Sequence, residues 1–199
     1  MPIKIVTICG SVRPGNYTSM ALALALSEFA KRSDVEVDAL DLAAFDLPFP
    51  GRGARDTSSE RFRESVKSAT GVVLATPEYH GSFSSVTKLA IENLGFPSVL
   101  AGKPVSLLGV AAGQIGAIKS LEHLRSVCSH VGAIVLPSLV SVANVQQVFD
   151  KEGRCLDSST EKRIRAVATS LLDYIQGAIC PRMVLEAMVR SRGEGEPVL

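Results

Sequence analysis

The stretch that decides the fold runs from residue 3 to residue 19 and reads IKIVTICGSVRPGNYTS. Its first part, 3–9, is a continuous apolar run rich in β-branched residues, which is typical of a strand covered on both faces of a sheet. A glycine- and hydroxyl-rich loop follows, and from Thr18 to Lys31 apolar residues recur at helical spacing on one face. The stretch therefore predicts a central parallel strand, a loop and a helix in direct succession.

The same alternation continues along the chain. Further strands are expected at 35–40, at 71–75 with an abrupt end at Thr76-Pro77, at 105–110, and at 133–142 with a break at Pro137. Helical spacing is found near 59–69, 86–94, 118–128 and 164–175. Five strands alternating with helices predict an α/β fold with a doubly wound, five-stranded parallel sheet, since right-handed crossovers leave few other ways to cover both faces. In such sheets ligands bind beyond the carboxyl ends of the strands.

The composition excludes several classes of protein. The chain has 199 residues, of which 46% are apolar and 21% charged, as expected for one globular domain and not for a disordered chain. A net charge of +1 gives no electrostatic reason to expect nucleic acid or an anionic membrane as a partner. The four cysteines have no metal-binding spacing. No secretory signal or membrane-spanning apolar run is present, so a cytoplasmic location is expected.

The domain organisation predicted from these patterns is simple. Residues 1–180 form one ligand-binding domain. Residues 181–199 form a C-terminal extension that keeps a few apolar residues, Leu185, Met188 and Val189, and ends in a Gly-Glu-rich tip that is expected to fray.

The loop after the first strand, Gly10–Ser19, has the composition of a phosphate-binding turn. A loop of this kind that opens a helix presents backbone N–H donors and the positive end of the helix dipole, and Arg13 adds a charged donor. The alternative is an ordinary turn in which Thr18 or Ser19 caps the helix. A dinucleotide-binding turn needs Gly-x-Gly-x-x-Gly and a Walker loop needs Gly-Lys-Ser/Thr, and neither is present. One phosphate of a mononucleotide fits better.

The loop after the third strand, Thr76–Ser85, has features of a site for a flat ring. Pro77 stiffens the exit from the strand, and Gly81 permits close approach of the backbone to a ring. Tyr79 and Phe83 can flank such a ring, with core packing as the alternative. For His80 the alternatives are contact with the ring edge or a place in a surface loop.

A third small-residue loop, Ala111–Ala117, follows the fourth strand and contains Gly113 and Gln114. Its backbone amides can reach the other edge of a bound ring. Each loop alone is weak evidence, but all three are expected at the carboxyl ends of neighbouring strands. Their common position is the stronger signal for one shared site.

The three loops resemble the signatures of the NADPH-dependent FMN reductase family, which includes bacterial flavin, quinone, azo-dye and chromate reductases. The first signature, Gly-Ser-x-Arg, is matched by Gly10, Ser11 and Arg13. Asn16 and Thr18 stand where the family usually has Ser and Asn, and both can still hydrogen-bond a phosphate.

The second signature resembles Pro-Glu-Tyr-Asn-x-Ser followed by a helix with a lysine, and is matched by Pro77, Glu78, Tyr79, Ser82 or Ser84, and Lys88. His80 replaces the usual Asn. The third, a Gly-x-x-Gly loop leading into a helix with Leu-Arg near its end, is matched by Gly113, Gly116, Leu124 and Arg125. The resemblance covers roughly Ile3 to Gln176.

The resemblance implies a flavodoxin-like fold, bound FMN, and NADPH or NADH as electron donor, with the flavin rather than a side chain carrying the chemistry. It also implies a small-molecule acceptor, such as a flavin, quinone, azo compound or metal oxyanion, and a homodimer or homotetramer. The cofactor-binding residues implied are Ser11, Arg13, Asn16, Tyr17, Thr18, Pro77, Glu78, Tyr79, His80, Gly81, Ser82, Gly113 and Gln114.

Two other functions remain open at this point. A non-enzymatic electron carrier of the same fold usually has a Thr-x-Thr-Gly-x-Thr phosphate loop and a strongly acidic surface, and this sequence has neither. A cofactor-free binding or regulatory module on the same scaffold is the third possibility.

Overall fold

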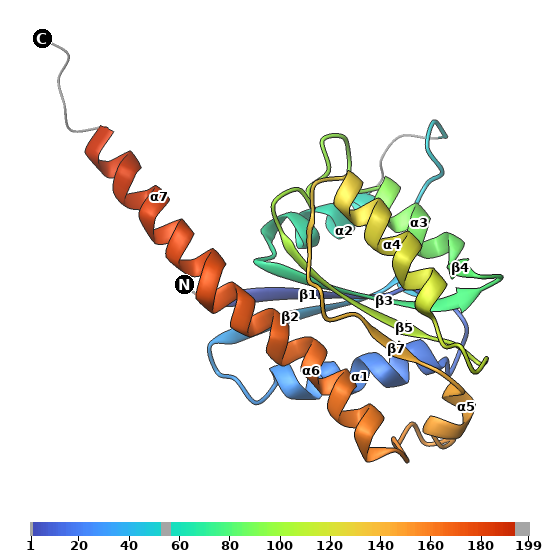
Figure 1. Ribbon diagram of the computed structural model, residues 1–199. Coiled ribbons are helices and arrows are strands. Elements are labelled where there is room, and N and C mark those ends of the chain that lie inside the picture. Colours follow the sequence, from blue (N-terminus) through green and yellow to red (C-terminus); the bar gives the residue numbers. More distant parts are fainter. Residues whose placement is uncertain (1, 53–56, 194–199) are drawn as a thin grey trace, which may run out of the picture.

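The computed structural model describes residues 2–52 and 57–193 and shows an α/β fold with one sheet between two layers of helices (Figure 1). The strand order is β2-β1-β3-β5-β6, and the pairs along this path are parallel. Strand β2 lies next to β1 on one side, and β3 and β5 follow on the other side of β1. The strand order therefore reverses beside β1. The predicted doubly wound, flavodoxin-like fold class is confirmed.

The elements follow each other in the expected alternation. The strands are β1 (Ile3–Cys9), β2 (Val35–Asp41), β3 (Gly71–Tyr79), β4 (Ser82–Phe83), β5 (Pro104–Val110), β6 (Ile134–Val135) and β7 (Val140–Val142). The helices are α1 (Tyr17–Phe29), α2 (Thr57–Ser68), α3 (Ser85–Glu92), α4 (Ile118–His130), α5 (Val145–Val148), α6 (Ser158–Tyr174) and α7 (Cys180–Gly193). A 3₁₀ turn (Leu42–Ala44) follows β2, and a π-helical turn, η2 (Ile175–Ile179), joins α6 to α7.

The predicted number of five strands is wrong, because the sheet has seven. The expected strand at 133–142 is two short strands, β6 and β7, which pair with opposite ends of β5. Pro137 lies between them and has no N–H to continue a ladder. The seventh strand, β4, is antiparallel to the end of β3, so the sheet is not purely parallel.

Strand β3 also continues past the end predicted at Thr76-Pro77. It runs to Tyr79, with Pro77 paired opposite Val110 at the last rung shared with β5. Beyond that rung, Glu78 and Tyr79 pair with β4 in a tight hairpin. The extension carries Pro77, Glu78 and Tyr79 out of the sheet at its carboxyl edge.

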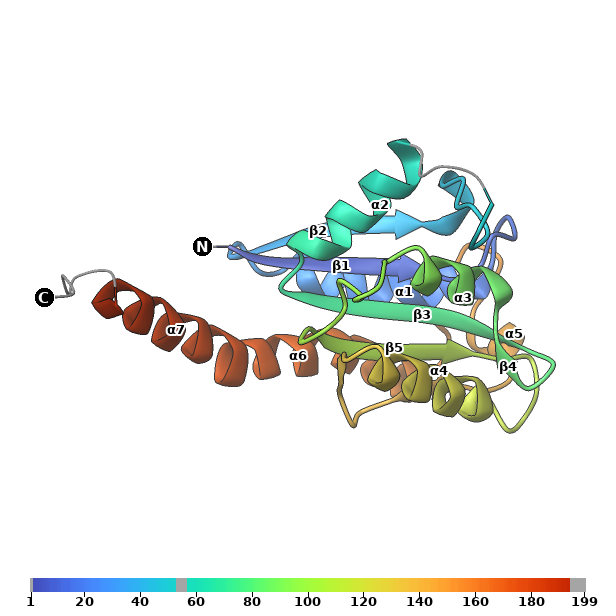
Figure 2. The same cartoon turned by 90° about the horizontal axis from the view of Figure 1, so that it is seen from above.

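Each face of the sheet has its own hydrophobic core. Helices α1 and α6 cover one face, packed on Ile5, Val73 and Leu108, and helices α2, α3 and α4 cover the other, packed on Ile8 and Leu74 (Figure 2). All seven residues of β5 are buried, as are the first seven of β3. This explains why both strands are largely apolar in the sequence, with the polar residues Thr76 and Ser106 buried among them.

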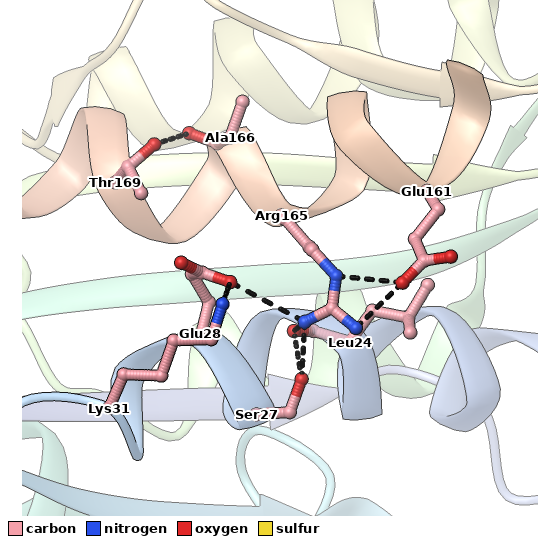
Figure 3. A network of polar contacts seen from close by, with 8 residues as sticks. All are labelled: Leu24, Ser27, Glu28, Lys31, Glu161, Arg165, Ala166 and Thr169. Carbon is pink, nitrogen blue, oxygen red and sulfur yellow. Dashed lines mark hydrogen bonds and ion pairs between the residues drawn. The ribbon is translucent and has the colours of Figure 1, made fainter. Parts of the chain in front are cut away.

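A polar network fastens α1 to α6 on the outer side of one core (Figure 3). Arg165 of α6 donates to Glu161 Oε1 on its own helix (2.8 Å) and, across to α1, to the hydroxyl of Ser27 (2.6 Å) and to Glu28 Oε2 (3.4 Å). The pKa of Glu28 lies below its usual value, mainly because Lys31 donates a hydrogen bond to its carboxylate. The nearby charge of Arg165 lowers this pKa further. The network therefore stabilises the helix pair above the acid range and weakens as Glu28 becomes protonated.

The C-terminal extension begins as a helix that projects from the body of the molecule (Figures 1 and 2). Helix α7 continues α6 through the π-helical turn and ends at Gly193. The predicted fraying tip, 194–199, lies outside the described residues, and the domain boundary at residue 180 remains a prediction. Within residues 2–52 and 57–193, no helix is long and apolar enough to cross a bilayer.

Candidate functional site

A cavity of about 580 Å³ lies at the carboxyl ends of β1, β3 and β5, a volume in the usual range for a small-molecule site. Residues from all three strand-end loops line it, together with the short helix α5. The lining from the first loop is Ser11, Arg13, Pro14, Gly15, Asn16, Tyr17 and Thr18. The lining from the second is Pro77, Glu78 and Tyr79, and the remainder is Val110, Ala111, Ala112, Val145 and Gln146.

The first loop is organised by the side chain of Asn16. Its Oδ1 accepts the N–H of Ser19 (2.8 Å), and its Nδ2 donates to the carbonyl of Arg13 (2.7 Å). Asn16 is thus the N-cap of α1, and the sequence alternative that Thr18 or Ser19 caps this helix is wrong. Asn is one of the residues preferred at an N-cap. The side-chain amide of Asn16 makes both of these hydrogen bonds within the loop. The N–H groups of Tyr17 and Thr18, at the start of the helix, have no partner within it.

Ser11 and Arg13 supply donors at this end of the cavity. Ser11 is buried, and its hydroxyl has no hydrogen-bond partner within residues 2–52 and 57–193. Three other buried side-chain atoms, in Thr7, Arg63 and Ser120, are also without a partner among the described residues, and Ser11 is the one of these four residues that lines the cavity. Arg13 lies beside it on the exposed rim and makes no ion pair with any described residue. Its guanidinium lies 4.8 Å from the centre of the Tyr79 ring, so the first and second loops are in contact.

Cys9, the last residue of β1, lies beneath the same loop. Its Sγ is 3.7 Å from the carbonyl oxygen of Ser11 and 3.8 Å from Asn16 Oδ1. Burial raises the pKa of the Cys9 thiol, so it stays protonated at neutral pH and donates weakly to these oxygens. Cys9 therefore supports the loop as a buried free thiol.

A buried group of hydroxyls joins the first loop to the second. Ser84, the N-cap of α3, donates to the carbonyl of Gly10 (2.5 Å) and lies 2.8 Å from the Thr87 hydroxyl. The backbone N–H of Ser84 donates to the hydroxyl of Thr76 (3.2 Å). Gly10 is packed so closely here that an added Cβ would lie 2.7 Å from the carbonyl oxygen of Ala75 and overlap Thr87. The ends of β1 and β3 are thus fixed relative to each other.

The β3–β4 hairpin turns on His80 and Gly81, which have φ angles of 51° and 77°. Two successive positive φ values form the tight hairpin turn in which Asn-Gly is the preferred pair. The positive φ of Gly81 serves this turn, and its close approach to a bound ring stays a prediction. His80, Gly81 and Ser82 do not line the cavity, and the Ser82 hydroxyl instead hydrogen-bonds His123 Nδ1 of α4 (3.1 Å).

Glu78 connects the hairpin to the start of α4. The N-cap position of α4, Ala117, has no side chain to accept a hydrogen bond from the helix. Glu78 Oε2 takes this place and accepts the N–H of Ser120 (3.1 Å), while the Ser141 hydroxyl accepts the N–H of Ala117 (2.8 Å). A carboxylate is favourable at this position because the amino end of a helix carries partial positive charge. Glu78 thereby holds one wall of the cavity in place.

Replacing Glu78 by alanine is expected to lower the free energy of unfolding by about 0.5–2 kcal/mol, the usual cost of losing a helix N-cap. Glu78→Gln keeps an oxygen acceptor on a side chain of the same length. We expect its free energy of unfolding to fall by less than half as much as that of the alanine variant. Urea denaturation of the two variants and the parent chain measures the difference. Equal stability of the parent and the alanine variant would contradict a capping role.

The third loop contributes residues that differ from those predicted. Ala111 and Ala112 line the cavity, whereas Gly113 and Gln114, two residues further along, do not. The carbonyl oxygens of Ala111 and Gly113 accept the N–H groups of Val145 (3.0 Å) and Asn144 (3.2 Å), so this loop is turned toward α5. A Cβ on Gly113 would meet nothing within 4 Å, so no close approach requires glycine there.

Sequence reasoning missed the contribution of α5 entirely. Val145 and Gln146 line the cavity, and Gln146 Nε2 donates to the carbonyl of Ala112 (3.1 Å). No signal pointed to this helix, because it has four residues and follows a strand, β7, that was expected as part of a longer one. The position of Ala111 and Ala112 directly after β5 is the signal that was available for those two residues.

Lys88 and Arg125, which match the second and third sequence signatures, lie outside the cavity. Lys88 forms an ion pair with Glu92 one turn along α3, and Arg125 does not line the cavity. Within the described residues no group of three or more His, Cys, Asp or Glu side chains is placed to bind a metal ion. The site therefore offers backbone amides, the Ser11 hydroxyl and the Arg13 guanidinium, together with apolar and aromatic side chains.

Comparison with known proteins gives a consistent result. The model of the family described as NADPH-dependent FMN reductase matches residues 3–147. An NAD(P)H-dependent FMN reductase of Pseudomonas aeruginosa is 33% identical over 186 residues, covering 87% of this chain and 96% of that protein. A quinone reductase of Escherichia coli is 30% identical over 182 residues, again covering 87% and 96%.

Among solved structures, a flavoenzyme NAD(P)H:(acceptor) oxidoreductase from Paracoccus denitrificans superposes with a TM-score of 0.75. The match covers 88% of this chain and 98% of that one. At 19% sequence identity this likeness concerns the fold, and it agrees with the sheet order and helix layers described above.

Proposed function

Because this chain belongs to the NADPH-dependent FMN reductase family, we propose that it binds FMN in the cavity at the strand ends and reduces a quinone or similar small acceptor with electrons from NAD(P)H. FMN, when bound, would supply the redox chemistry, the transfer of two electrons from NAD(P)H to the acceptor. The chain's own residues bind and orient the cofactor, and no side-chain acid or base is required.

The observation that carries this proposal is the donor set at the loop end of the cavity. The unpaired hydroxyl of Ser11, the first N–H groups of α1 at Tyr17 and Thr18, and the guanidinium of Arg13 are all groups that donate to phosphate. Asn16 holds these donors in place through its two hydrogen bonds within the loop. The residues present therefore fit the phosphate of FMN.

The remaining walls fit the ring of the same cofactor. Pro77, Tyr79, Ala111, Ala112 and Val145 also line the cavity, so an aromatic ring system bound there would meet mainly apolar surface at the sheet edge. Glu78 lines the same cavity and also fixes the hairpin to α4 through its hydrogen bond with Ser120, so its contact with the cofactor stays a prediction. Gly81, Ser82, Gly113 and Gln114 are at most at the periphery, and His80 sets the hairpin turn.

Steady-state kinetics test the activity. We expect ping-pong behaviour, since donor and acceptor are proposed to approach the ring in turn from the same open side of the cavity. With NADPH and a benzoquinone varied together, the FMN-loaded protein is expected to give parallel lines in a double-reciprocal plot. Intersecting lines would contradict a single position shared by donor and acceptor. If the protein alone does not oxidise NADPH, the result would favour an electron carrier that needs a separate reductase.

A further inference from the structure

Helix α5, which lies beyond the carboxyl end of β7 (Figure 1), is fastened to the third loop through three successive carbonyl groups. Residues 111–113 all use their carbonyl oxygens as acceptors for α5 and the residue before it. Two of the donors are backbone N–H groups, those of Val145 (3.0 Å) and Asn144 (3.2 Å). The bond to the carbonyl of Ala112 (3.1 Å) differs, because its donor is a side chain, Nε2 of Gln146.

The N–H groups of the same peptides point away from α5. The C=O and N–H of a planar trans peptide point in opposite directions, and the cis bond of the described residues is Phe96-Pro97, outside this loop. The N–H groups of Ala112, Gly113 and Gln114 therefore face away from the helix, and none of them donates to a described residue. All three residues are exposed, and Ala112 lines the cavity. The loop thus presents a row of free donors beside the cavity.

Gln146 fixes the middle peptide of this row, which joins Ala112 to Gly113. A carbonyl oxygen only accepts hydrogen bonds, so the side-chain N–H of Gln146 determines which way it points. Little else restrains this peptide, because glycine adopts positive and negative φ with similar ease and a Cβ on Gly113 would meet nothing within 4 Å. If the peptide turned over, the carbonyl of Ala112 would take the place of the Gly113 N–H, and a donor would become an acceptor.

The charges of the cavity lining give these backbone donors a role. Among the described residues, Arg13 is the one Lys or Arg side chain in the lining, and it belongs to the phosphate loop. The lining also contains a carboxylate, that of Glu78, which opposes any negative charge placed near it. Negative charge on a bound ring therefore depends for stabilisation on backbone N–H groups at the edge of the site.

We propose that Gln146 is a positioning residue that keeps the Gly113 N–H, and not the Ala112 carbonyl, directed toward the edge of the flavin ring. This inference rests on the proposed function, which places FMN in the cavity. Reduction adds negative charge to the ring, and a fixed N–H donor at the edge stabilises that charge whereas a carbonyl oxygen opposes it. Gln146 thereby raises the affinity of the chain for reduced FMN relative to oxidised FMN.

Gln146→Leu and Gln147→Leu are a matched pair that tests the proposal without changing the net charge. Gln147 is the next residue of α5 and is also exposed, but its side chain neither lines the cavity nor hydrogen-bonds a described residue. Titration of the flavin-free chain gives the affinity for oxidised FMN. Reductive titration of the FMN-loaded chain against a reference dye gives the midpoint potential of the bound cofactor.

We expect Gln146→Leu to lower the affinity for reduced FMN relative to oxidised FMN by about 10-fold, the scale of one hydrogen bond to a charged group. For a two-electron couple this lowers the midpoint potential by about 30 mV. The potential of Gln147→Leu is expected to equal that of the parent.

Three results overturn the proposal. If Gln146→Leu binds FMN more weakly at an unchanged potential, Gln146 braces the cavity without directing a donor at the ring. If neither the affinity nor the potential changes, Gln146 does not control the peptide. If Gln147→Leu shifts the potential as much as Gln146→Leu, the loss of any polar side chain on α5 is responsible. Failure of the proposed function is distinguishable from these, because the unaltered chain would then give no saturable FMN titration.

Discussion

Replacing Arg13 by alanine is expected to weaken FMN binding by about 10- to 150-fold, because a hydrogen bond to a charged group contributes about 1.5–3 kcal/mol. Arg13 lies on the rim of the cavity beside the unpaired Ser11 hydroxyl, and no carboxylate of the described chain competes for its guanidinium. Its charge is therefore available to the phosphate. Equilibrium titration of the flavin-free protein with FMN, followed by flavin fluorescence, gives the affinity.

Riboflavin, which lacks the phosphate, is the control for this prediction. The contact between Arg13 and the Tyr79 ring contributes about 0.5–1 kcal/mol whichever flavin is bound, so riboflavin is expected to lose only a few-fold in affinity. Arg13→Lys keeps the charge without the planar fork and is expected to fall between the parent and the alanine variant. Equal losses for FMN and riboflavin would contradict the phosphate contact.

Replacing Gly10 by alanine is expected to lower the free energy of unfolding by about 2–4 kcal/mol, which is at or above the usual range for overpacking a closely packed site. The new Cβ would lie 2.7 Å from the carbonyl oxygen of Ala75 and would overlap the Thr87 hydroxyl. Relief requires separating β1 from β3 or moving α3, and either movement disturbs the cavity as well. FMN affinity is therefore expected to fall together with stability.

Gly113→Ala is the matched control. Gly113 is in a loop of the same sheet edge, has no positive φ, and has no atom within 4 Å of the added Cβ. Its substitution is expected to change the free energy of unfolding by less than about 0.5 kcal/mol. Urea denaturation of both variants measures the difference. If Gly10→Ala were as stable as Gly113→Ala, the close packing of the strand ends would be wrong.

The fold could be predicted because its central strands are buried on both faces. Burial of β3 and β5 by helices on each side produces continuous apolar runs that the sequence shows directly. The short strands could not be predicted in the same way. Two or three residues, as in β4, β6 and β7, carry no periodicity, and their pairing depends on the position of β3 and β5 in space.

The candidate site was predicted best where a local rule applies. The first loop opens a helix, and every residue predicted from it lines the cavity, from Ser11 to Thr18. The role of Asn16 as the N-cap was not foreseen, because Thr18 and Ser19 are equally good capping residues by type.

Prediction was weaker where the site depends on tertiary contacts. His80, in place of the family's Asn, takes a positive φ, a conformation in which Asn, Asp and His are all enriched. The hairpin that it forms contacts α4 through the hydrogen bond between Ser82 and His123, and this contact cannot be read from the loop sequence. Of the third loop, Ala111 and Ala112 line the cavity and Gly113 and Gln114 do not, because the loop contacts α5. Contacts with a helix that has no sequence signature cannot be read from the loop itself.

Titration of the flavin-free chain with FMN tests the central claim most directly, namely that three strand-end loops form one site for this cofactor. The predicted result is a saturable change in flavin fluorescence that ends at one FMN per chain, with riboflavin bound more weakly. A signal that never saturates, or saturation that is the same with and without the phosphate, would contradict the assignment.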